Sequence, residues 1–279
     1  KNLIFGASGV IGSEFINKLN IKDSLFTSRK KPITDKKINW QKLNLDKSDL
    51  KKLPENVKTI FFFASPHYTD KNLKIKDCFK KELLWVKKII KNINCEKFVF
   101  TSSSSIYSDK HQIGIYKKKI EKNLSLSKIK FIQIWRPFSL IGFNNYALSD
   151  HFHNILIKNI IKKKKKQINF NGSINDERGY SSVVKFCNEV YKKQKLNKSF
   201  IYNYRNKNLV KIKKIIEIFQ LVLKKNKLRS FTYKFKYLKT NKNYDYKKLN
   251  KVKTIFSNEN SDIVLYNHFN NIIHNEKKL

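Results

Sequence analysis

The chain has 279 residues and a formal net charge of +40, so it is long enough to bury a full hydrophobic core without a stabilising metal or disulfide. Only five of its 61 basic residues are arginines, and the lysines are spread along the whole sequence. Proteins that read phosphates and bases favour the planar fork of arginine, so we expect no specific nucleic-acid partner. No run approaches the roughly 18 apolar residues that span a bilayer, so we expect no membrane partner either.

In the first half of the chain, short apolar runs alternate with amphipathic stretches. Strands are predicted at 2–5, 24–27, 38–43, 59–64, 97–102 and 131–135, and helices at 10–19, 77–93 and 117–124. The run Ile60-Phe61-Phe62-Phe63 is apolar at every position, as expected of a strand buried on both faces. This alternation predicts an α/β fold, with a doubly wound parallel sheet covered by helices on both sides.

After Pro137 the pattern changes. A helix is expected around 151–162, short strands at 167–170 and 200–204, and a helix at 209–224 before a tail rich in lysine and asparagine. We place a domain change near residue 145. Residues 1–145 would form the first domain, with strand six and nearby helices continuing to about 165, and residues 146–279 would form a smaller α/β region packed on it.

Three cysteines, Cys78, Cys95 and Cys187, lie far apart and show neither disulfide nor metal-ligand spacing. We interpret them as buried small hydrophobic residues, and we expect no metal site. An odd number of scattered cysteines is typical of a reducing compartment, so we expect a cytoplasmic protein.

Three glycines, Gly6, Gly9 and Gly12, lie at a spacing of three between the first strand and the first helix. Gly6 permits a sharp turn, Gly9 lets the backbone approach a diphosphate, and Gly12 lets the helix pack closely on the strand. The helix start also favours a negative group through its free N–H groups and its dipole. The motif therefore predicts a dinucleotide pyrophosphate site whose residues are Gly6, Ser8, Gly9, Val10, Ile11 and Gly12.

The G-x-x-G-x-x-G spacing resembles that of the short-chain dehydrogenase/reductase superfamily, in particular its extended branch of nucleotide-sugar epimerases and dehydratases. Further segments carry the resemblance over residues 2 to about 205: Asn44-Leu45, Phe63-Ala64-Ser65, the run from Phe98 to Tyr107, the run from Arg136 to Gly142, and more weakly the run from Arg178 to Val183 and Tyr202-Asn203.

The resemblance implies a Rossmann-type sheet and a set of site residues. Asn44 and Leu45 would touch adenine, and Ala64, Pro137 and Ser139 would line the rest of the cofactor. Ser103 would be the catalytic serine and would also contact substrate, and Arg178 would be a substrate residue. Family members are often dimers, so a homodimer is an expectation by analogy.

The end of the second strand bears on the choice of cofactor. A site for NAD places a carboxylate there to accept from the ribose 2′-OH, whereas NADP requires a cation and hydroxyls for the 2′-phosphate. This chain has Ser28 and Arg29 and no carboxylate. We therefore expect NADP, with NAD as the other possibility.

The family's chemistry uses a tyrosine and a lysine one helical turn later, in the pattern Y-G-x-x-K-x-x-x-E. One register aligns Gly114, Lys117 and Glu121 with this pattern and places Ile113 at the tyrosine. The other register starts from Tyr116 and leaves Ile120 at the lysine position.

Positions 113 and 116 share a helix face, so Tyr116 is a possible surrogate phenol; otherwise it is an ordinary half-buried tyrosine. Lys117 would hold the cofactor ribose. The segment between Tyr107 and Gly114 is shorter than the substrate loop usual in the family.

Two hypotheses for function follow. The first is an NAD(P)-dependent oxidoreductase or epimerase that acts on a carbonyl or hydroxyl of a nucleotide sugar or similar metabolite. The second, motivated by the missing tyrosine, is a dinucleotide-binding sensor or scaffold without turnover. The high charge keeps nucleic-acid binding as a third and weaker reading.

Overall fold

The computed structural model describes residues 1–19, 22–47, 50–66, 75–108, 111–142, 152–236 and 251–276. The chain divides into two compact units, each discontinuous in sequence. Unit 1 comprises Lys1–Pro137, Val183–Tyr204 and Tyr244–Ile255, and unit 2 comprises Phe138–Ser182, Arg205–Asn243 and Phe256–Leu279. The domain change is expected near residue 145. That position falls within 143–151, outside the described residues, so the domain change stays a prediction.

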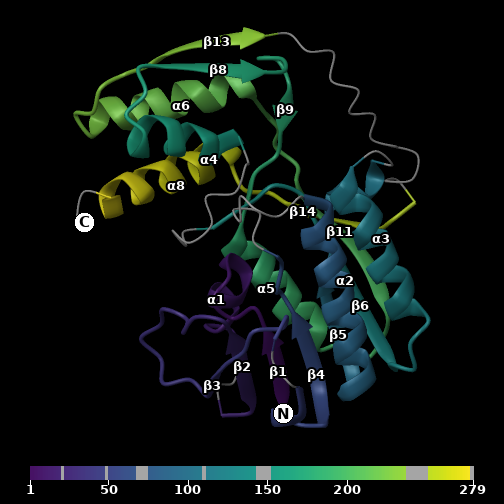
Figure 1. Ribbon diagram of the computed structural model, residues 1–279. Coiled ribbons are helices and arrows are strands. Elements are labelled where there is room, and N and C mark those ends of the chain that lie inside the picture. Colours follow the sequence, from purple (N-terminus) through teal and green to yellow (C-terminus); the bar gives the residue numbers. More distant parts are fainter. Residues whose placement is uncertain are drawn as a thin grey trace. The chain divides into compact units, whose positions relative to one another are not determined.

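An eight-stranded sheet forms the centre of unit 1 (Figure 1). Its order is β14-β11-β6-β5-β4-β1-β2-β3, and every pairing from β11 to β3 is parallel. This confirms the predicted α/β fold with a Rossmann-like sheet. The strands are β1 (Asn2–Phe5), β2 (Ser24–Ser28), β3 (Trp40–Lys42), β4 (Asn56–Phe62), β5 (Asn94–Thr101), β6 (Phe131–Pro137), β11 (Phe200–Asn206) and β14 (Thr254–Ser257).

Two pairs of helices cover the two faces of this sheet. Neighbouring residues of a strand point to opposite faces, so Phe61 and Phe62 contact different helices. The centroid of the Phe61 ring lies 4.9 Å from that of the Phe15 ring in α1 (Val10–Phe15). Helix α1 packs against α5 (Val183–Gln194). On the other face, Phe62 shares a buried cluster with residues of α2 (Ile75–Asn92) and α3 (Gln112–Ser125).

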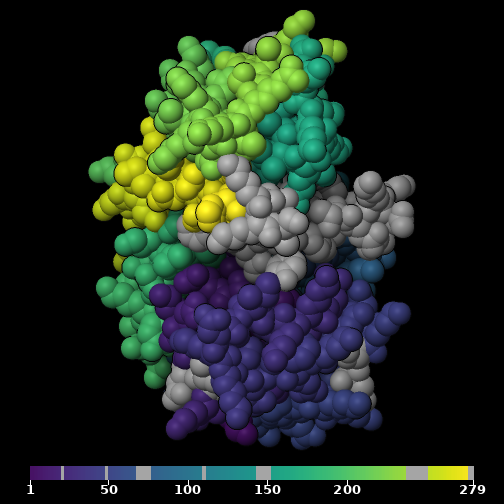
Figure 2. All heavy atoms as spheres, turned by 90° about the vertical axis from the view of Figure 1, so that its left-hand side faces the viewer, coloured from purple at the N-terminus to yellow at the C-terminus, as the bar shows by residue number. Residues whose placement is uncertain are grey.

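The surface at the β3 edge of the sheet is formed by the early part of the chain, coloured purple to blue in Figure 2. Arg29 is exposed in this part, directly after β2. A short 3₁₀ turn, η1 (Leu50–Lys52), precedes β4, and a second, η2 (Ser104–Tyr107), follows β5. None of the helices that the structure describes combines the length and apolar character needed to cross a bilayer.

The described residues of unit 2 form three helices and three small strand pairs around one apolar cluster. The helices are α4 (Phe152–Ile157), continued by the π-helical segment η3 (Lys158–Lys162), α6 (Ile212–Lys225) and α8 (Ser261–Glu276). The strand pairs are β8 (Gln167–Asn171) with β13 (Thr232–Lys236), β7 (Leu140–Ile141) with β10 (Ser181–Ser182), and β9 (Glu177–Arg178) with β12 (Val210–Lys211).

Several predicted boundaries were wrong. The first helix ends at Phe15 rather than at residue 19, because the N–H groups of Asn17 and Lys18 bond three residues back in tight turns. The helix α8 lies where a tail was expected. Its buried residues Leu265, Phe269 and Ile272 repeat at the three- and four-residue spacing of a helix face, so the signal was present in the sequence.

Candidate cofactor site

The glycine loop after β1 has the geometry of a backbone cradle. Gly6 has φ +83°, and a Cβ there would lie 2.5 Å from the Ala64 nitrogen. A Cβ on Gly12 would lie within 3.0 Å of the Gly6 carbonyl oxygen. At Gly9 the nearest atom to such a Cβ is the Gly6 oxygen at 3.2 Å, and no other atom of the described residues outside its chain neighbours lies within 4 Å of it. Two glycines are therefore required by packing, whereas Gly9 leaves room for a group to approach the backbone.

Strand ends bring most of the predicted site residues of unit 1 to one edge. The parallel strands β1, β2, β4, β5 and β6 end near Gly6, Ser28, Ala64, Ser103 and Pro137 respectively, and parallel strands present their carboxyl ends at the same edge. The N–H groups of Gly6 and Ala7 both donate to the Thr27 carbonyl oxygen at 3.0 Å. Ligands of open α/β sheets bind outside this edge.

The residues expected at the adenosine end already take part in local contacts. The Ser28 hydroxyl donates to the Lys30 carbonyl oxygen at 2.6 Å and accepts from Trp40 Nε1 at 3.0 Å. Asn44 Oδ1 accepts from the N–H of Asp46 at 3.1 Å, and Leu45 packs against the apolar cluster under the sheet. Arg29 is exposed and is the residue of this group best placed to meet a phosphate from solvent.

Lys117 of α3 is buried and paired with a carboxylate. Its Nζ donates to Glu82 Oε1 at 2.6 Å and to the carbonyl oxygen of Thr101, the last residue of β5, at 3.0 Å. It also lies 4.7 Å from the centroid of the Phe100 ring. Burial raises the pKa of the Glu82 carboxyl, and the charge and hydrogen bond of Lys117 oppose that rise.

Neither candidate for the tyrosine position faces solvent openly. Ile113 is half-buried one turn before Lys117, and Tyr116 is 8 % exposed. Both pack in a small cluster with Cys78 and Phe79 of α2. Gly114 lies between them, and a Cβ there would clash with the Ser105 carbonyl oxygen, so α3 begins in direct contact with η2.

Ser103 begins η2 at the carboxyl end of β5. Its Oγ accepts from the N–H of Ser105 at 3.1 Å and lies 2.8 Å from Ser105 Oγ. This is a capping contact of the kind expected of a serine before a helical turn. The side chain remains half-buried rather than enclosed, at the strand end where the predicted substrate oxygen would lie.

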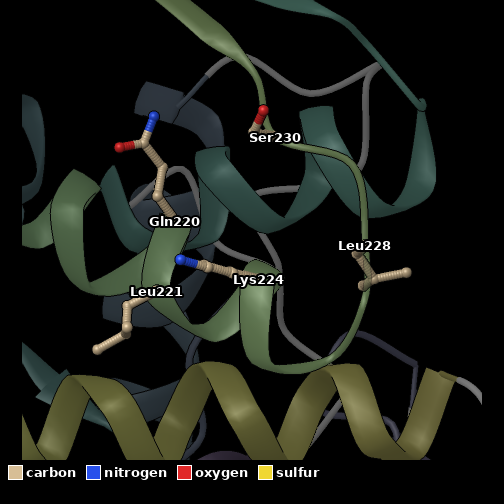
Figure 3. A pocket seen from close by; sticks show the side chains of 5 residues that line it. All are labelled: Gln220, Leu221, Lys224, Leu228 and Ser230. Atoms are coloured by element: carbon tan, nitrogen blue, oxygen red, sulfur yellow. The ribbon is translucent and has the colours of Figure 1, made fainter.

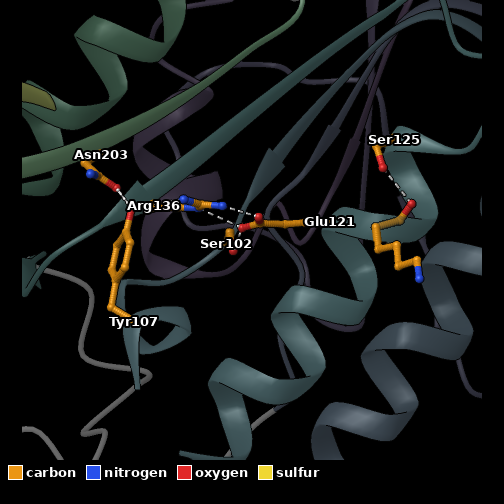
Figure 4. A network of polar contacts seen from close by, with 7 residues as sticks. Ser102, Tyr107, Glu121, Ser125, Arg136 and Asn203 are labelled. Carbon is orange, nitrogen blue, oxygen red and sulfur yellow. Dashed lines mark hydrogen bonds and ion pairs between the residues drawn. The ribbon is translucent and has the colours of Figure 1, made fainter. Parts of the chain in front are cut away.

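A buried polar network runs through the carboxyl ends of β5, β6 and β11 (Figure 4). Arg136 makes a two-point contact with Glu121, with Nε to Oε1 at 3.1 Å and a terminal nitrogen to Oε2 at 2.5 Å. Ser102 Oγ donates to Glu121 Oε1 at 2.5 Å, Arg136 donates to the Tyr107 hydroxyl at 2.9 Å, and Tyr107 donates to Asn203 Oδ1 at 2.7 Å. The network fixes the strand ends against α3.

Two of the predicted residues, Ser139 and Arg178, belong to unit 2. Ser139 has φ +44°, a conformation that a non-glycine residue rarely adopts, and its carbonyl oxygen accepts from the N–H of Ser181 at 3.3 Å. Arg178 lies 3.7 Å from Asp176 at the surface. Ser182 is held nearby in the same unit by Glu259, through its N–H at 2.9 Å and its hydroxyl at 2.6 Å.

An open groove on unit 2 has no comparable chemistry. It is lined by Gln220, Leu221, Lys224, Leu228 and Ser230, from α6 and the segment that follows (Figure 3). Lys224 is the one ionisable side chain among these five. Within the described residues, no three His, Cys, Asp or Glu side chains gather as metal ligands.

Comparison with known proteins decides the family. Residues 2–187 match the family described as the NAD dependent epimerase/dehydratase family. The chain belongs to this family. No curated protein sequence matches the chain.

Solved epimerase and dehydratase structures resemble this epimerase/dehydratase family member along nearly its whole length. A UDP-glucuronic acid 4-epimerase from Bacillus cereus in complex with NAD is 17 % identical, with a TM-score of 0.72 and 99 % of each chain covered. A NAD-dependent NDP-hexosamine 5,6-dehydratase involved in tunicamycin biosynthesis is 13 % identical, with a TM-score of 0.72, 96 % of this chain and 97 % of that chain covered. A UDP-galactose 4-epimerase is 15 % identical, with a TM-score of 0.71 and 98 % and 99 % covered. At these identities the likeness establishes the fold.

One buried residue of this epimerase/dehydratase family member, Glu82, was not predicted from the sequence. Glu82 is completely buried, and it stands on the apolar stripe of α2 between Phe79 and Val86, which are also buried. A carboxylate at a buried position of an amphipathic helix requires a partner, and that rule could have pointed to a lysine across the helix pair. The identity of that lysine came only from the packing of α2 on α3.

Proposed function

We propose that this chain binds a nicotinamide dinucleotide at the glycine loop and acts on a hydroxyl or carbonyl carbon of a nucleotide sugar. The observation that carries the proposal is the cradle. Gly6 and Gly12 are fixed by packing, whereas a Cβ on Gly9 would enter the open space that a diphosphate needs. The residues present therefore fit the pyrophosphate of NAD, the cofactor named in the description of the family.

In this proposal the chain's own residues bind and orient. When bound, the nicotinamide supplies the hydride acceptor or donor. The N–H groups at the start of α1 and the open face of Gly9 hold the diphosphate. Ser103, at the carboxyl end of β5, donates a hydrogen bond to the substrate oxygen, and Lys117, held by Glu82 and Thr101 at the end of the same strand, binds a ribose hydroxyl.

Cofactor titration tests the cradle directly. Gly9→Val fills the open space and is expected to remove measurable binding of NAD⁺ and NADP⁺ in titration calorimetry, with the far-UV circular dichroism spectrum unchanged. Leu126→Val, at a position that is 75 % exposed in the same unit, serves as the control and is expected to bind normally. Normal binding by a folded Gly9→Val variant would show that the loop does not hold the diphosphate.

The choice between the two cofactors depends on Arg29. The relatives whose descriptions name a cofactor are bound to NAD or dependent on it, whereas Arg29 at the end of β2 favours a 2′-phosphate. We propose that the chain accepts NADP through Arg29. Arg29→Ala is expected to weaken NADPH by on the order of 1.5–3 kcal/mol, as for a lost charged hydrogen bond, and to leave NADH unchanged. Equal losses for both would refute this assignment.

A second candidate function, cofactor binding without turnover, rests on a specific observation. In the register that aligns Gly114, Lys117 and Glu121 with the motif, the tyrosine position holds Ile113, and the nearby Tyr116 is buried against Cys78 and Phe79. An assay of the purified chain with a panel of UDP-sugars and both oxidised cofactors separates the two candidates. Turnover supports the enzyme, and in that case Tyr116→Phe tests whether this phenol transfers the proton, which is worth about 10²- to 10⁴-fold in rate. Tight cofactor binding with no turnover on any sugar supports the second candidate.

A further inference from the structure

The pairing of Lys117 with Glu82 changes what the lysine can do. Both side chains are enclosed, with 6 % of the Lys117 side chain and none of the Glu82 side chain exposed. Nζ lies 2.6 Å from Oε1, so the two groups are in direct contact. Because the two opposite charges are in contact, a neighbouring group experiences the fields of both, and the two contributions largely cancel.

The same helix pair contains the position where a phenol would stand. Ile113 lies four residues before Lys117, on the same face of α3. It packs in the cluster of Cys78, Phe79 and Tyr116, and Cys78 and Phe79 lie one turn before Glu82 on α2. A side chain at position 113 and the carboxylate of Glu82 are therefore both neighbours of the Lys117 side chain, from opposite helices.

We propose that Glu82 is a positioning residue that holds Lys117 in a neutral pair, so that Lys117 contributes a fixed hydrogen bond but no longer lowers the pKa of a phenol at position 113. This inference rests on the proposed function, in which Lys117 lies beside the cofactor ribose. It extends that function by giving a physical reason for the isoleucine. A tyrosine beside a neutral pair gains no acidity, so the hydroxyl brings no advantage there.

Three features of the contact support a permanent pair rather than a passing one. Nζ is held from a second side by the Thr101 carbonyl oxygen at 3.0 Å. The ring of Phe100 covers a third side of Nζ, with its centroid 4.7 Å from that atom. The second carboxylate oxygen, Glu82 Oε2, is buried with no hydrogen-bond partner among the described residues, so Lys117 is the group that compensates this carboxylate.

Other ionisable groups near the pair leave this balance in place. Glu121, one turn beyond Lys117, is already paired with Arg136. Tyr116 and Cys78 pack in the adjoining cluster, and Lys119 Nζ lies 5.2 Å from the centroid of the Tyr116 ring. The charge that position 113 experiences is therefore set mainly by Lys117 and Glu82.

The test introduces the phenol and measures its acidity without cofactor. Ile113→Tyr is made alone and combined with Glu82→Gln, which keeps the size and the oxygen acceptor but removes the negative charge. Ile113→Phe gives the reference spectrum for the phenolate difference signal in an ultraviolet pH titration. Ile113 is half-buried, so a longer side chain can extend towards solvent.

With Glu82 present, the new phenol is expected to titrate at or above about 10, the value of a free tyrosine. With Glu82→Gln, Lys117 is left as an unbalanced positive charge, and the pKa of the phenol is expected to fall by about one to three units. A pKa below about 9 in Ile113→Tyr alone, or no fall in the double variant, would overturn the proposal.

A second pair of variants keeps the proposal testable if the Glu82→Gln chain does not fold. In the Ile113→Tyr background, Lys117→Gln removes the ammonium, and the buried Glu82 then takes up a proton and becomes neutral. The proposal expects the pKa of the phenol to stay the same, because one neutral arrangement replaces another. A rise of about one unit would show that the charge of Lys117 had been acting on the phenol.

These titrations need no bound dinucleotide, so their result is independent of the cofactor experiment. Failure of Gly9→Val to abolish binding would refute the cradle and leave the charge pairing untouched. A strongly lowered pKa of the phenol in Ile113→Tyr would refute the pairing and leave the cradle untouched. If both proposals hold, turnover with a nucleotide sugar is expected to rise in Ile113→Tyr/Glu82→Gln and not in Ile113→Tyr alone.

Discussion

Loss of the Glu121 charge is expected to destabilise unit 1 strongly. Glu121 is 8 % exposed and Arg136 9 % exposed, and they share two hydrogen bonds. Burial by itself would lower the pKa of the Arg136 guanidinium, but the hydrogen bonds and the charge of Glu121 outweigh burial and raise it. An arginine guanidinium is not deprotonated in proteins, so in Glu121→Gln it stays charged and loses its counter-ion.

The magnitude follows from what the Glu121→Gln variant leaves behind. The amide side chain would preserve the size of the original and one acceptor oxygen, so little packing is lost. The cost is an uncompensated charge in an enclosed place, about 3–5 kcal/mol for a broken buried pair. Ser102 Oγ, which donates to Glu121 Oε1, keeps a weaker partner in the amide.

Urea unfolding followed by tryptophan fluorescence provides the assay. All three tryptophans, Trp40, Trp85 and Trp135, belong to unit 1, so the signal reports on the unit that holds the network. Lys81→Gln is the matched control, because the Lys81–Asp46 pair in the same unit spans 3.7 Å with side chains 39 % and 36 % exposed. This control is expected to cost no more than about 1 kcal/mol. Equal losses in Glu121→Gln and Lys81→Gln would refute the reasoning.

Two further predictions use urea unfolding, followed by tryptophan fluorescence for Gly114 in unit 1 and by far-UV circular dichroism for His268 in unit 2. Gly114→Ala places a Cβ against the Ser105 carbonyl oxygen and is expected to lower the free energy of unfolding by about 1–3 kcal/mol. Gly9→Ala is the control, because the nearest atom to its Cβ is 3.2 Å away, and it is expected to change the free energy of unfolding by less than half as much. Equal effects of the two substitutions would contradict the clash at Gly114. Burial lowers the pKa of His268 to about 4, against about 6.5 in the unfolded chain, so the unfolded state takes up the proton first as the pH falls. Stability is therefore expected to drop by about 3 kcal/mol between pH 6.5 and 4, and His268→Phe to lack this part of the pH dependence; an unchanged pH dependence in that variant would count against the assignment.

The sequence by itself determined the sheet, the glycine loop and the family. The run Ile60–Phe63 has no polar position, which predicts a strand buried on both faces. In the structure this run lies in and directly after β4, which pairs with β1 on one side and β5 on the other. The glycine spacing predicts the loop without knowledge of the tertiary structure, because only a residue without a side chain tolerates the turn at Gly6 and the contact at Gly12. These are local rules, and each depends on a few neighbouring residues.

The tertiary structure decided which charged groups meet. Lysine makes up so much of this chain that the sequence offered Glu82 many partners, and Lys117 lies 35 positions away on another helix. The same holds for Arg136 and Asn203, which join through Tyr107 although they stand far apart in the chain. Burial makes such pairs necessary because a lone charge is costly away from water, but only the packing of helices and strands selects the partner.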